Sequence, residues 1–170
     1  CPGNTEEQAK PMTVRITNPV AVRGVSAYVI KGTGSTARFL LMRRTDKKSS
    51  FWAQVAGKIE ENETAWQAAL REIKEETSIE PEKFYSADIC EQFYEIDRDS
   101  VWLSPVFVAF VNEEQKVVLN EEHDAFEWLT VEEALERLIF ASQRQAIISI
   151  REEFLDRTPN EWLWIDQNLK

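Results

Sequence analysis

The sequence GKIEENETAWQAALREIKEETSI, residues 57–79, decides the fold. In it Ala65, Ala69 and Ile73 recur every four residues, so a helix through them would carry one apolar stripe. A glycine and a polar run precede these residues, which is typical of a turn that leads into a helix. The pattern predicts a helix over residues 63–77 whose apolar side packs on a core.

Three carboxylates crowd the last turns of this predicted helix. Glu72, Glu75 and Glu76 project within an arc of about 100° because an α-helix turns once in about 3.6 residues. The negative end of the helix dipole disfavours each carboxylate by a few tenths to about 1 kcal/mol, before their mutual repulsion is counted. A hard divalent cation would turn that repulsion into coordination. The alternative is a solvated acidic face whose charge Arg71 and Lys74 partly offset.

The wider spacing of this stretch resembles the Nudix hydrolase family. The resemblance rests on Gly57, on Glu63 six positions later, and on the run REIKEE at residues 71–76, with aliphatic Ile79 closing the pattern. One position departs from the family, which normally has glycine where this chain has Ser78. Since glycine eases a left-handed exit from a helix, Ser78 implies a different exit geometry or a modest strain. The departure removes no catalytic group.

The resemblance implies a magnesium site at this helix, with manganese as the alternative metal. By the same resemblance Glu63 and Arg71 form an ion pair that orients the ligating glutamates. Metal-activated water would then attack phosphorus in line with the leaving group, without a covalent intermediate. The implied metal ligands are the backbone carbonyl of Gly57 and the carboxylates of Glu72, Glu75 and Glu76.

A second acidic group, residues 121–124, falls in a predicted loop before a strand. Many Nudix hydrolases carry a further metal ligand or general base on a loop in this region. The resemblance therefore favours Glu122 for that role, with Glu121 as the weaker choice. A solvated acidic turn is the alternative. His123 is a candidate for contact with substrate phosphate, although a lone exposed histidine more often has no special role.

Basic and aromatic residues gather before the deciding stretch in an otherwise acidic chain. Arg43 and Arg44 lie at a predicted strand end and are candidates to bind a triphosphate tail. Lys47 and Lys48 are at least as well explained as loop residues that keep a hairpin soluble. Aromatic side chains are candidates to stack on a planar ring, although the hydrophobic core is the default for most of them. These aromatics are Phe51, Trp52, Phe93, Tyr94 and Trp102.

The order of elements indicates the fold class. Strands, one helix, more strands and then helices follow one another, which differs from the regular alternation of a doubly wound parallel sheet. This order predicts an α/β fold of the α+β type, and the resemblance implies the Nudix fold, a mixed β-sheet packed between helices. The almost continuously apolar strand at 102–111 is expected to be central. Strands are predicted at 25–30 and 38–42 as a hairpin, and at 52–55, 85–94, 102–111 and 126–129, with later helices at 130–139 and 142–154.

Length and composition bound the remaining possibilities. A chain of 170 residues with 43% hydrophobic content fits one domain, which we expect over residues 12–170, with residues 1–11 as a flexible leader or expression remnant. A formal charge of −10 would repel long nucleic acids and acidic membranes. Two cysteines and no long apolar run favour a soluble, cytoplasmic protein. Monomer and homodimer both stay open.

Further motifs resemble a bacterial Nudix subgroup that hydrolyses dihydroneopterin triphosphate or dATP to the monophosphate and diphosphate. These motifs are FWAQV at residues 51–55, EWL at 127–129 and SQRQA at 142–146. The first alternative is a Nudix hydrolase of a dinucleoside polyphosphate, a nucleotide sugar or an oxidised nucleotide. The second is a Nudix-like module that binds a nucleotide without cleaving it. A pure binder, however, has no physical reason to keep repelling carboxylates together.

Overall fold

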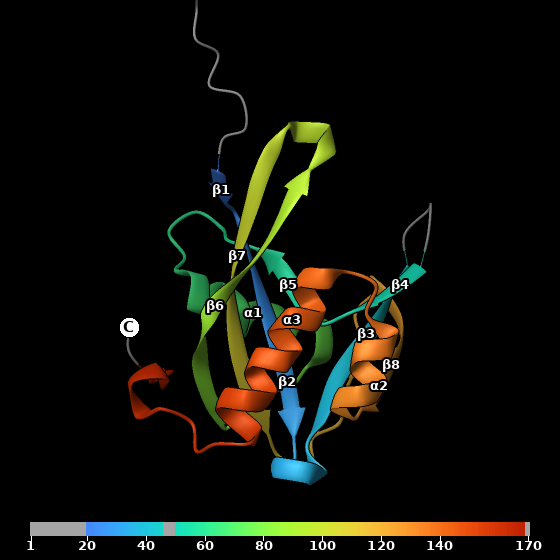
Figure 1. Ribbon diagram of the computed structural model, residues 1–170, viewed down its shortest axis with the longest axis vertical. Helices are drawn as coiled ribbons and strands as arrows, with labels where there is room; N and C mark the ends of the chain where they lie inside the picture. Colours follow the sequence, from blue (N-terminus) through green and yellow to red (C-terminus); the bar gives the residue numbers. More distant parts are fainter. Residues whose placement is uncertain (1–19, 46–49, 169–170) are drawn as a thin grey trace, which may run out of the picture.

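The computed structural model describes residues 20–45 and 50–168. The expected leader at residues 1–11 and the two lysines, Lys47 and Lys48, lie outside these described residues. One hydrogen-bonded sheet of eight strands runs through the described part of the chain (Figure 1). The strands are β1 (Val20–Val22), β2 (Gly24–Lys31), β3 (Arg38–Thr45), β4 (Ser50–Ala53), β5 (Val55–Lys58), β6 (Lys83–Glu95), β7 (Ser100–Val111) and β8 (His123–Leu129).

Helices cover both faces of this sheet, with α2 and α3 toward the viewer in Figure 1 and α1 behind the sheet. Short helical turns join or follow the longer elements, and α3 continues directly into a π-helical turn. None of the helices within residues 20–45 and 50–168 is long and apolar enough to span a membrane. The helical elements are α1 (Ala65–Thr77), α2 (Val131–Arg137), α3 (Ala141–Ile150), η1 (Gly34–Thr36), η2 (Ile96–Arg98), the π-turn η3 (Arg151–Leu155) and η4 (Glu161–Leu163).

Strand alternation builds two cores, one on each face of the sheet. On β2, Val25 and Val29 pack in the cluster that contains Ile73 of α1. Tyr28 and Ile30, on the opposite face of the same strand, pack in the other cluster, which holds residues of α2 and α3. The predicted mixed sheet between helices is therefore confirmed, as is its α+β type.

Strand β7 is an interior strand of the sheet, with neighbours on both sides, as its apolar sequence predicted. It pairs in parallel with β1 and β2 and antiparallel with β6. Burial on both faces explains why β7 reads as an almost unbroken apolar run.

The segment predicted as one strand at 52–55 is two strands, so that prediction was wrong. The pairing changes partner at Gln54, where β4 on β3 gives way to β5 on β2. This is because β2 and β3 form the predicted hairpin only next to its turn, at Ile30↔Phe39 and Lys31↔Arg38, and then diverge (Figure 1). Residues of β2, β3, β4 and β5 around this fork line the cavity of the candidate site.

The two ends of α1 follow local chemistry. Thr64 is the N-cap, since its hydroxyl accepts from the backbone N–H of Gln67 in a capping box, so the helix begins at Ala65 rather than near 63. At the other end Ser78 has φ 60° and ψ 15°. Ser78 thus keeps the left-handed exit and carries the strain that a glycine would avoid. The capping box of α2 at Thr130 is also present, but that helix ends at Arg137 instead of reaching 139.

Candidate active site

Helix α1 lays the carboxylates of its last turns against strand β5. Gly57 on β5 lies beneath Glu72, and a Cβ added at Gly57 would overlap the Glu72 carboxylate. Only glycine therefore lets this carboxylate lie so close to the strand. The close approach explains why the predicted pattern starts with glycine and fixes where Glu72 stands.

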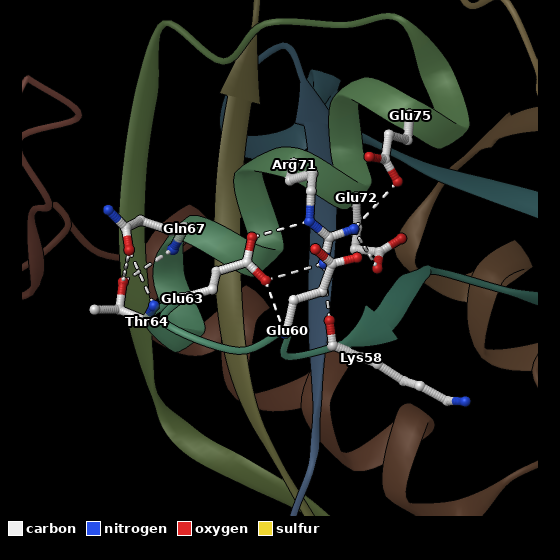
Figure 2. Close-up of polar contacts among 8 residues, drawn as sticks. All are labelled: Lys58, Glu60, Glu63, Thr64, Gln67, Arg71, Glu72 and Glu75. Atoms are coloured by element: carbon white, nitrogen blue, oxygen red, sulfur yellow. Dashed lines mark hydrogen bonds and ion pairs between the residues drawn. The ribbon is translucent and has the colours of Figure 1, made fainter.

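Arg71 is the centre of the polar network on this helix (Figure 2). Its Nε and Nη2 donate to the two carboxylate oxygens of Glu63 at 2.9 and 3.0 Å, as a fork. Its Nη1 donates to Glu72 at 2.8 Å and to Glu75 at 3.1 Å. Nη2 also donates to the carbonyl of Lys58 at 2.9 Å, which ties the helix to the end of β5. Arg71 therefore holds two of the three crowded carboxylates in place.

The charges of this network shift the pKa values of its members. The hydrogen bond from Arg71 lowers the pKa of Glu63, so Glu63 stays ionised as its partner. Burial raises the pKa of Glu72, against the opposing effect of Arg71, and the charges of Glu75 and Glu122 raise it further. A proton is therefore harder to remove from Glu72 than from a solvated glutamate.

Glu76 is the least satisfied side chain of the network. It is only 3% exposed, and its Oε2 atom is buried without a hydrogen-bond partner among the described residues. Burial raises its pKa to about 8, and the nearby carboxylates of Glu72 and Glu122 add to the shift. The charge of Arg44 and a backbone hydrogen bond at Ala56 lower the pKa of Glu76, but they do not outweigh burial and the two carboxylates.

These residues fit a divalent cation. Arg71 takes one oxygen each from Glu72 and Glu75, and in this arrangement the described residues hold no converged group of three His, Cys, Asp or Glu ligands. The second oxygen of each carboxylate and the buried Oε2 of Glu76 stay available. Oxygen-only donors suit magnesium, whose charge would offset the repulsion that raises the pKa of Glu76.

A cavity of about 780 Å³ opens beside the network. The glutamates of α1 line it with Gly57, as do Glu122, in the turn before β8, and His123, the first residue of β8. Glu122 accepts a hydrogen bond from Nη2 of Arg44 at 3.0 Å. Glu121 is not among the residues that line the cavity, so the structure brings only the favoured member of this acidic pair to the site.

His123 differs from the exposed loop residue expected from the sequence. It begins β8, is 8% exposed, and its Nδ1 lies 2.9 Å from Oδ1 of Asn120. Burial lowers the pKa of His123, and the positive charge of Arg44 lowers it further. The histidine is therefore neutral near pH 7 and faces the cavity as a polar, uncharged group.

Strand alternation separates residues that the sequence treated alike. Arg44 lines the cavity, whereas Arg43 forks onto Asp124 at 2.6 and 2.9 Å outside the lining. Likewise Phe51 lines the cavity. Trp52 packs against the core, with the guanidinium of Arg137 4.6 Å from its ring centroid. Of these four predicted substrate-binding residues, the structure brings Arg44 and Phe51 to the glutamates of α1.

The three more distant aromatic candidates, Phe93, Tyr94 and Trp102, all line the cavity. A buried polar group that no sequence pattern predicted also lines the cavity, and Glu91 is its charged member. One signal was available, since Glu91 is a charged residue within a predicted strand beside the central one. The remaining members lie on separate elements that sequence spacing does not connect. They are Ser26, Gln54, Ser104 and Gln143.

Fold and site together define a pyrophosphohydrolase of one family. Residues 21–150 match the family described as NUDIX domain. The chain therefore belongs to the Nudix family, whose members act on phosphoanhydride bonds and generally depend on a divalent metal ion.

Two relatives and one solved structure give finer comparisons. The chain is 37% identical to an octanoyltransferase of Myxococcus xanthus over 135 residues, which cover 78% of this chain but only 38% of that protein. It is 32% identical to the dihydroneopterin triphosphate diphosphatase of Escherichia coli K12 over 142 residues, covering 74% of this chain and 90% of that enzyme. A Caenorhabditis elegans Ap4A hydrolase structure superposes with a TM-score of 0.67 at 22% identity, covering 78% of this chain and 96% of the other. That last likeness is one of fold.

Proposed function

We propose that this protein is a magnesium-dependent pyrophosphohydrolase that converts dihydroneopterin triphosphate or dATP to the monophosphate and diphosphate. The observation that carries the proposal is Glu76, a buried carboxylate beside like charges with one oxygen unpartnered. Such a group favours a site completed by a cation and a polyanionic substrate. The E. coli relative, named for its action on dihydroneopterin triphosphate, supports the choice of substrate.

Three glutamates and one glycine would hold the metal. Glu72, Glu75 and Glu76 offer carboxylate oxygens, and Gly57 offers its backbone carbonyl. When bound, magnesium neutralises phosphate charge and eases departure of the diphosphate. Arg71 acts as a positioning residue, because its hydrogen bonds orient Glu72 and Glu75 while Glu63 holds its guanidinium.

The opposite wall of the cavity would handle substrate and proton. Arg44 lies beside Glu122 and offers guanidinium N–H groups to phosphate oxygens. Water adds to phosphorus, the bond between the α-phosphorus and the bridging oxygen breaks, and diphosphate leaves. Glu122 accepts the proton from that water at Oε1, since its Oε2 already accepts from Arg44. Neutral His123 keeps its proton on Nδ1, which donates to Oδ1 of Asn120, so its Nε2 can only accept a hydrogen bond at the same wall.

The alternative functions would use the same cavity. A dinucleoside polyphosphate, a nucleotide sugar or an oxidised nucleotide would place a phosphoanhydride on the same glutamates. A non-catalytic nucleotide-binding module would gain nothing from the repulsion at Glu76, and a neutral side chain there would be more stable.

A substrate panel with separate detection of diphosphate and phosphate tests the proposal. Dihydroneopterin triphosphate, dATP, Ap4A, a nucleotide sugar and an oxidised nucleotide are incubated with the purified protein and magnesium. We expect diphosphate release from the first two, lost on chelation. Glu75→Gln should lower kcat by about 10²–10⁴-fold, the range for removal of a group that acts on the transition state.

The matched control is Glu80→Gln, a glutamate just beyond α1 whose exposed side chain pairs with Lys74 and lies outside the cavity. It should keep the wild-type rate. Preferential turnover of Ap4A would overturn the proposed substrate but leave the protein a pyrophosphohydrolase. No turnover of any compound, with magnesium bound, would favour the binding module.

A further inference from the structure

The cavity has a second polar region that the phosphate chemistry does not use. Its side chains are buried and come from β2, β6, β7, α3 and the break between β4 and β5. We call it the buried polar group. Its members are Ser26, Gln54, Glu91, Ser104 and Gln143.

Three hydrogen bonds converge on the Glu91 carboxylate in this group. Tyr28 donates its hydroxyl to Oε1 at 2.5 Å, and Ser26 donates to Oε2 at 3.0 Å. Nε2 of Gln54 donates to the same Oε2 at 3.3 Å. Because three donors converge on it, Glu91 is held as a hydrogen-bond acceptor facing the cavity.

The hydrogen bonds of the buried polar group leave one acceptor, Oε1 of Gln143, without a donor. Nε2 of Gln143 donates to Oε1 of Gln54 at 2.8 Å, which fixes the orientation of the Gln143 amide. Oε1 of Gln143 is then buried without a partner among the described residues, on a side chain only 7% exposed. A buried acceptor without a donor destabilises the folded protein. A ligand N–H group would satisfy this oxygen once a small movement of Gln143 exposes it to the cavity that this residue lines.

The walls around these acceptors suit a flat ring. The rings of Phe93 and Trp102 are stacked with their centroids 6.0 Å apart, and Phe51 meets Phe140 edge to face at 5.9 Å. All four line the cavity. Nε1 of Trp102 donates to Oγ of Ser104 at 2.7 Å, which leaves the hydroxyl hydrogen of Ser104 for an acceptor on a ligand.

We propose that the buried polar group recognises the 2-amino-4-oxopyrimidine edge shared by guanine and pterin rings. Glu91 and Oε1 of Gln143 accept from the ring N–H and the neighbouring amino group, and the Ser104 hydroxyl donates to the ring carbonyl. This rests on the proposed function, which places the substrate in this cavity. Adenine presents a ring nitrogen acceptor beside its amino group, so its lone pair would face acceptors. The inference therefore favours dihydroneopterin triphosphate over dATP.

Binding of uncleavable ligands tests ring recognition apart from catalysis. GMP, IMP, AMP and 7,8-dihydroneopterin have no phosphoanhydride bond, so calorimetry with the wild-type protein measures their Kd directly. We expect GMP or dihydroneopterin to bind at least about tenfold more tightly than AMP, because one hydrogen bond to a charged group is worth that much. GMP should also bind more tightly than IMP, which lacks the amino group. The ratio of dihydroneopterin to GMP separates the pterin from the guanine source.

Two variants attribute the preference to the buried polar group. Glu91→Gln replaces a charged acceptor with an amide that also carries donors, and should reduce the GMP to AMP preference at least about tenfold. Gln143→Leu removes the unpartnered acceptor and should reduce the same preference. The matched control is Glu95→Gln on the same strand β6, whose side chain pairs with Arg98 and does not line the cavity. It should keep the wild-type ratio, and thermal melts confirm that each variant is folded.

The inference is overturned if AMP binds as tightly as GMP and dihydroneopterin, if none binds, or if a folded Glu91→Gln or Gln143→Leu variant keeps the preference. Diphosphate release from GTP, ATP and dihydroneopterin triphosphate is measured separately. Turnover without ring preference would reject the inference and keep the proposed function. Ring-selective binding without turnover of any triphosphate would keep the inference and reject the proposed function.

Discussion

Glu76 and Glu91 line the same cavity, and their surroundings are opposite. Both are buried, at 3% and 7% exposure. Around Glu76 the nearby charges that raise its pKa are Glu72 and Glu122, and its Oε2 has no hydrogen-bond partner among the described residues. Around Glu91, hydrogen bonds from Tyr28 and other donors oppose the rise in pKa that burial causes.

The difference teaches what each region needs. Glu91 is solvated by the protein itself, so its region is organised before any ligand arrives. Glu76 is buried beside like-charged neighbours, and in the proposed function a cation completes its region. We therefore expect the two ends of the cavity to differ in their dependence on magnesium.

The largest effect is expected from Glu72→Gln. Glu72 lies over Gly57 with its carboxylate held by Arg71, so the amide would weaken the metal site without a large change in volume. We expect kcat for diphosphate release to fall by about 10²–10⁴-fold for every substrate, whichever ring it carries. Steady-state kinetics at saturating magnesium measures this. Glu132→Gln on the exposed surface of α2 is the control, and an unchanged rate for Glu72→Gln would remove Glu72 from the metal site.

Glu76→Gln should stabilise the metal-free protein at alkaline pH. The pKa of Glu76 rises from about 4.5 in an unfolded chain to about 8 in the folded one. Between these values the folded state binds more protons than the unfolded state, so stability is full below about pH 4.5 and is lost as pH rises to about 8. The amide cannot ionise, so the variant escapes a penalty of about 4 kcal/mol at pH 8.

Thermal melts in a chelator at pH 5 and pH 8 check this prediction. The variant should gain Tm over the wild type at pH 8 and little at pH 5. Magnesium should shrink the gain, because the cation stabilises the ionised wild-type carboxylate. An equal effect at both pH values would mean that Glu76 is not the strained group, and the contrast with Glu91 would collapse.

The sequence anticipated the region of Glu76 far better than that of Glu91. Spacing along one helix places Glu72, Glu75 and Glu76 together whatever the rest of the chain does, since the periodicity is local. Gly57 and Glu63 lie outside this helix, and their roles were predicted only from the resemblance to the Nudix family. The class of fold was also predictable, because the order of apolar strands and helices restricts how layers can pack.

The region of Glu91 depends on pairing between distant segments. Gln54 enters the cavity because β4 and β5 take different partners, a choice that hydrogen bonds to β3 and β2 decide. The burial of His123 likewise depends on its register against Arg44 on β3. Arg43 and Arg44 were predicted to share one role, although strand alternation turns them to opposite faces and only one of these faces holds the site.

A smaller effect is expected from Tyr28→Phe, which tests the region of Glu91. The hydroxyl of Tyr28 donates to Oε1 of Glu91 and is fully buried, so its loss leaves that carboxylate oxygen short of a donor. We expect a loss of about 1–3 kcal/mol in the free energy of unfolding. Denaturant melts should give the same loss with magnesium and with chelator, because the partner of Tyr28 is not the cation. A loss that magnesium abolishes would contradict the independence of the two regions.

The smallest effect is expected from Ser78→Gly, which asks whether the strain at the metal end extends to the backbone. Ser78 ends α1 with φ 60°, two residues beyond Glu76, and its side chain makes only a long 3.5 Å hydrogen bond to the carbonyl of Val118. Glycine adopts this conformation without a Cβ clash, although it also loses more entropy on folding, so the net gain is about 0.5–1 kcal/mol. Denaturant melts measure it, and kcat should stay unchanged because Ser78 does not line the cavity. If glycine instead destabilises the protein, the cost at this end of the cavity lies in the carboxylates alone, and the contrast between Glu76 and Glu91 is one of side-chain solvation without a backbone contribution.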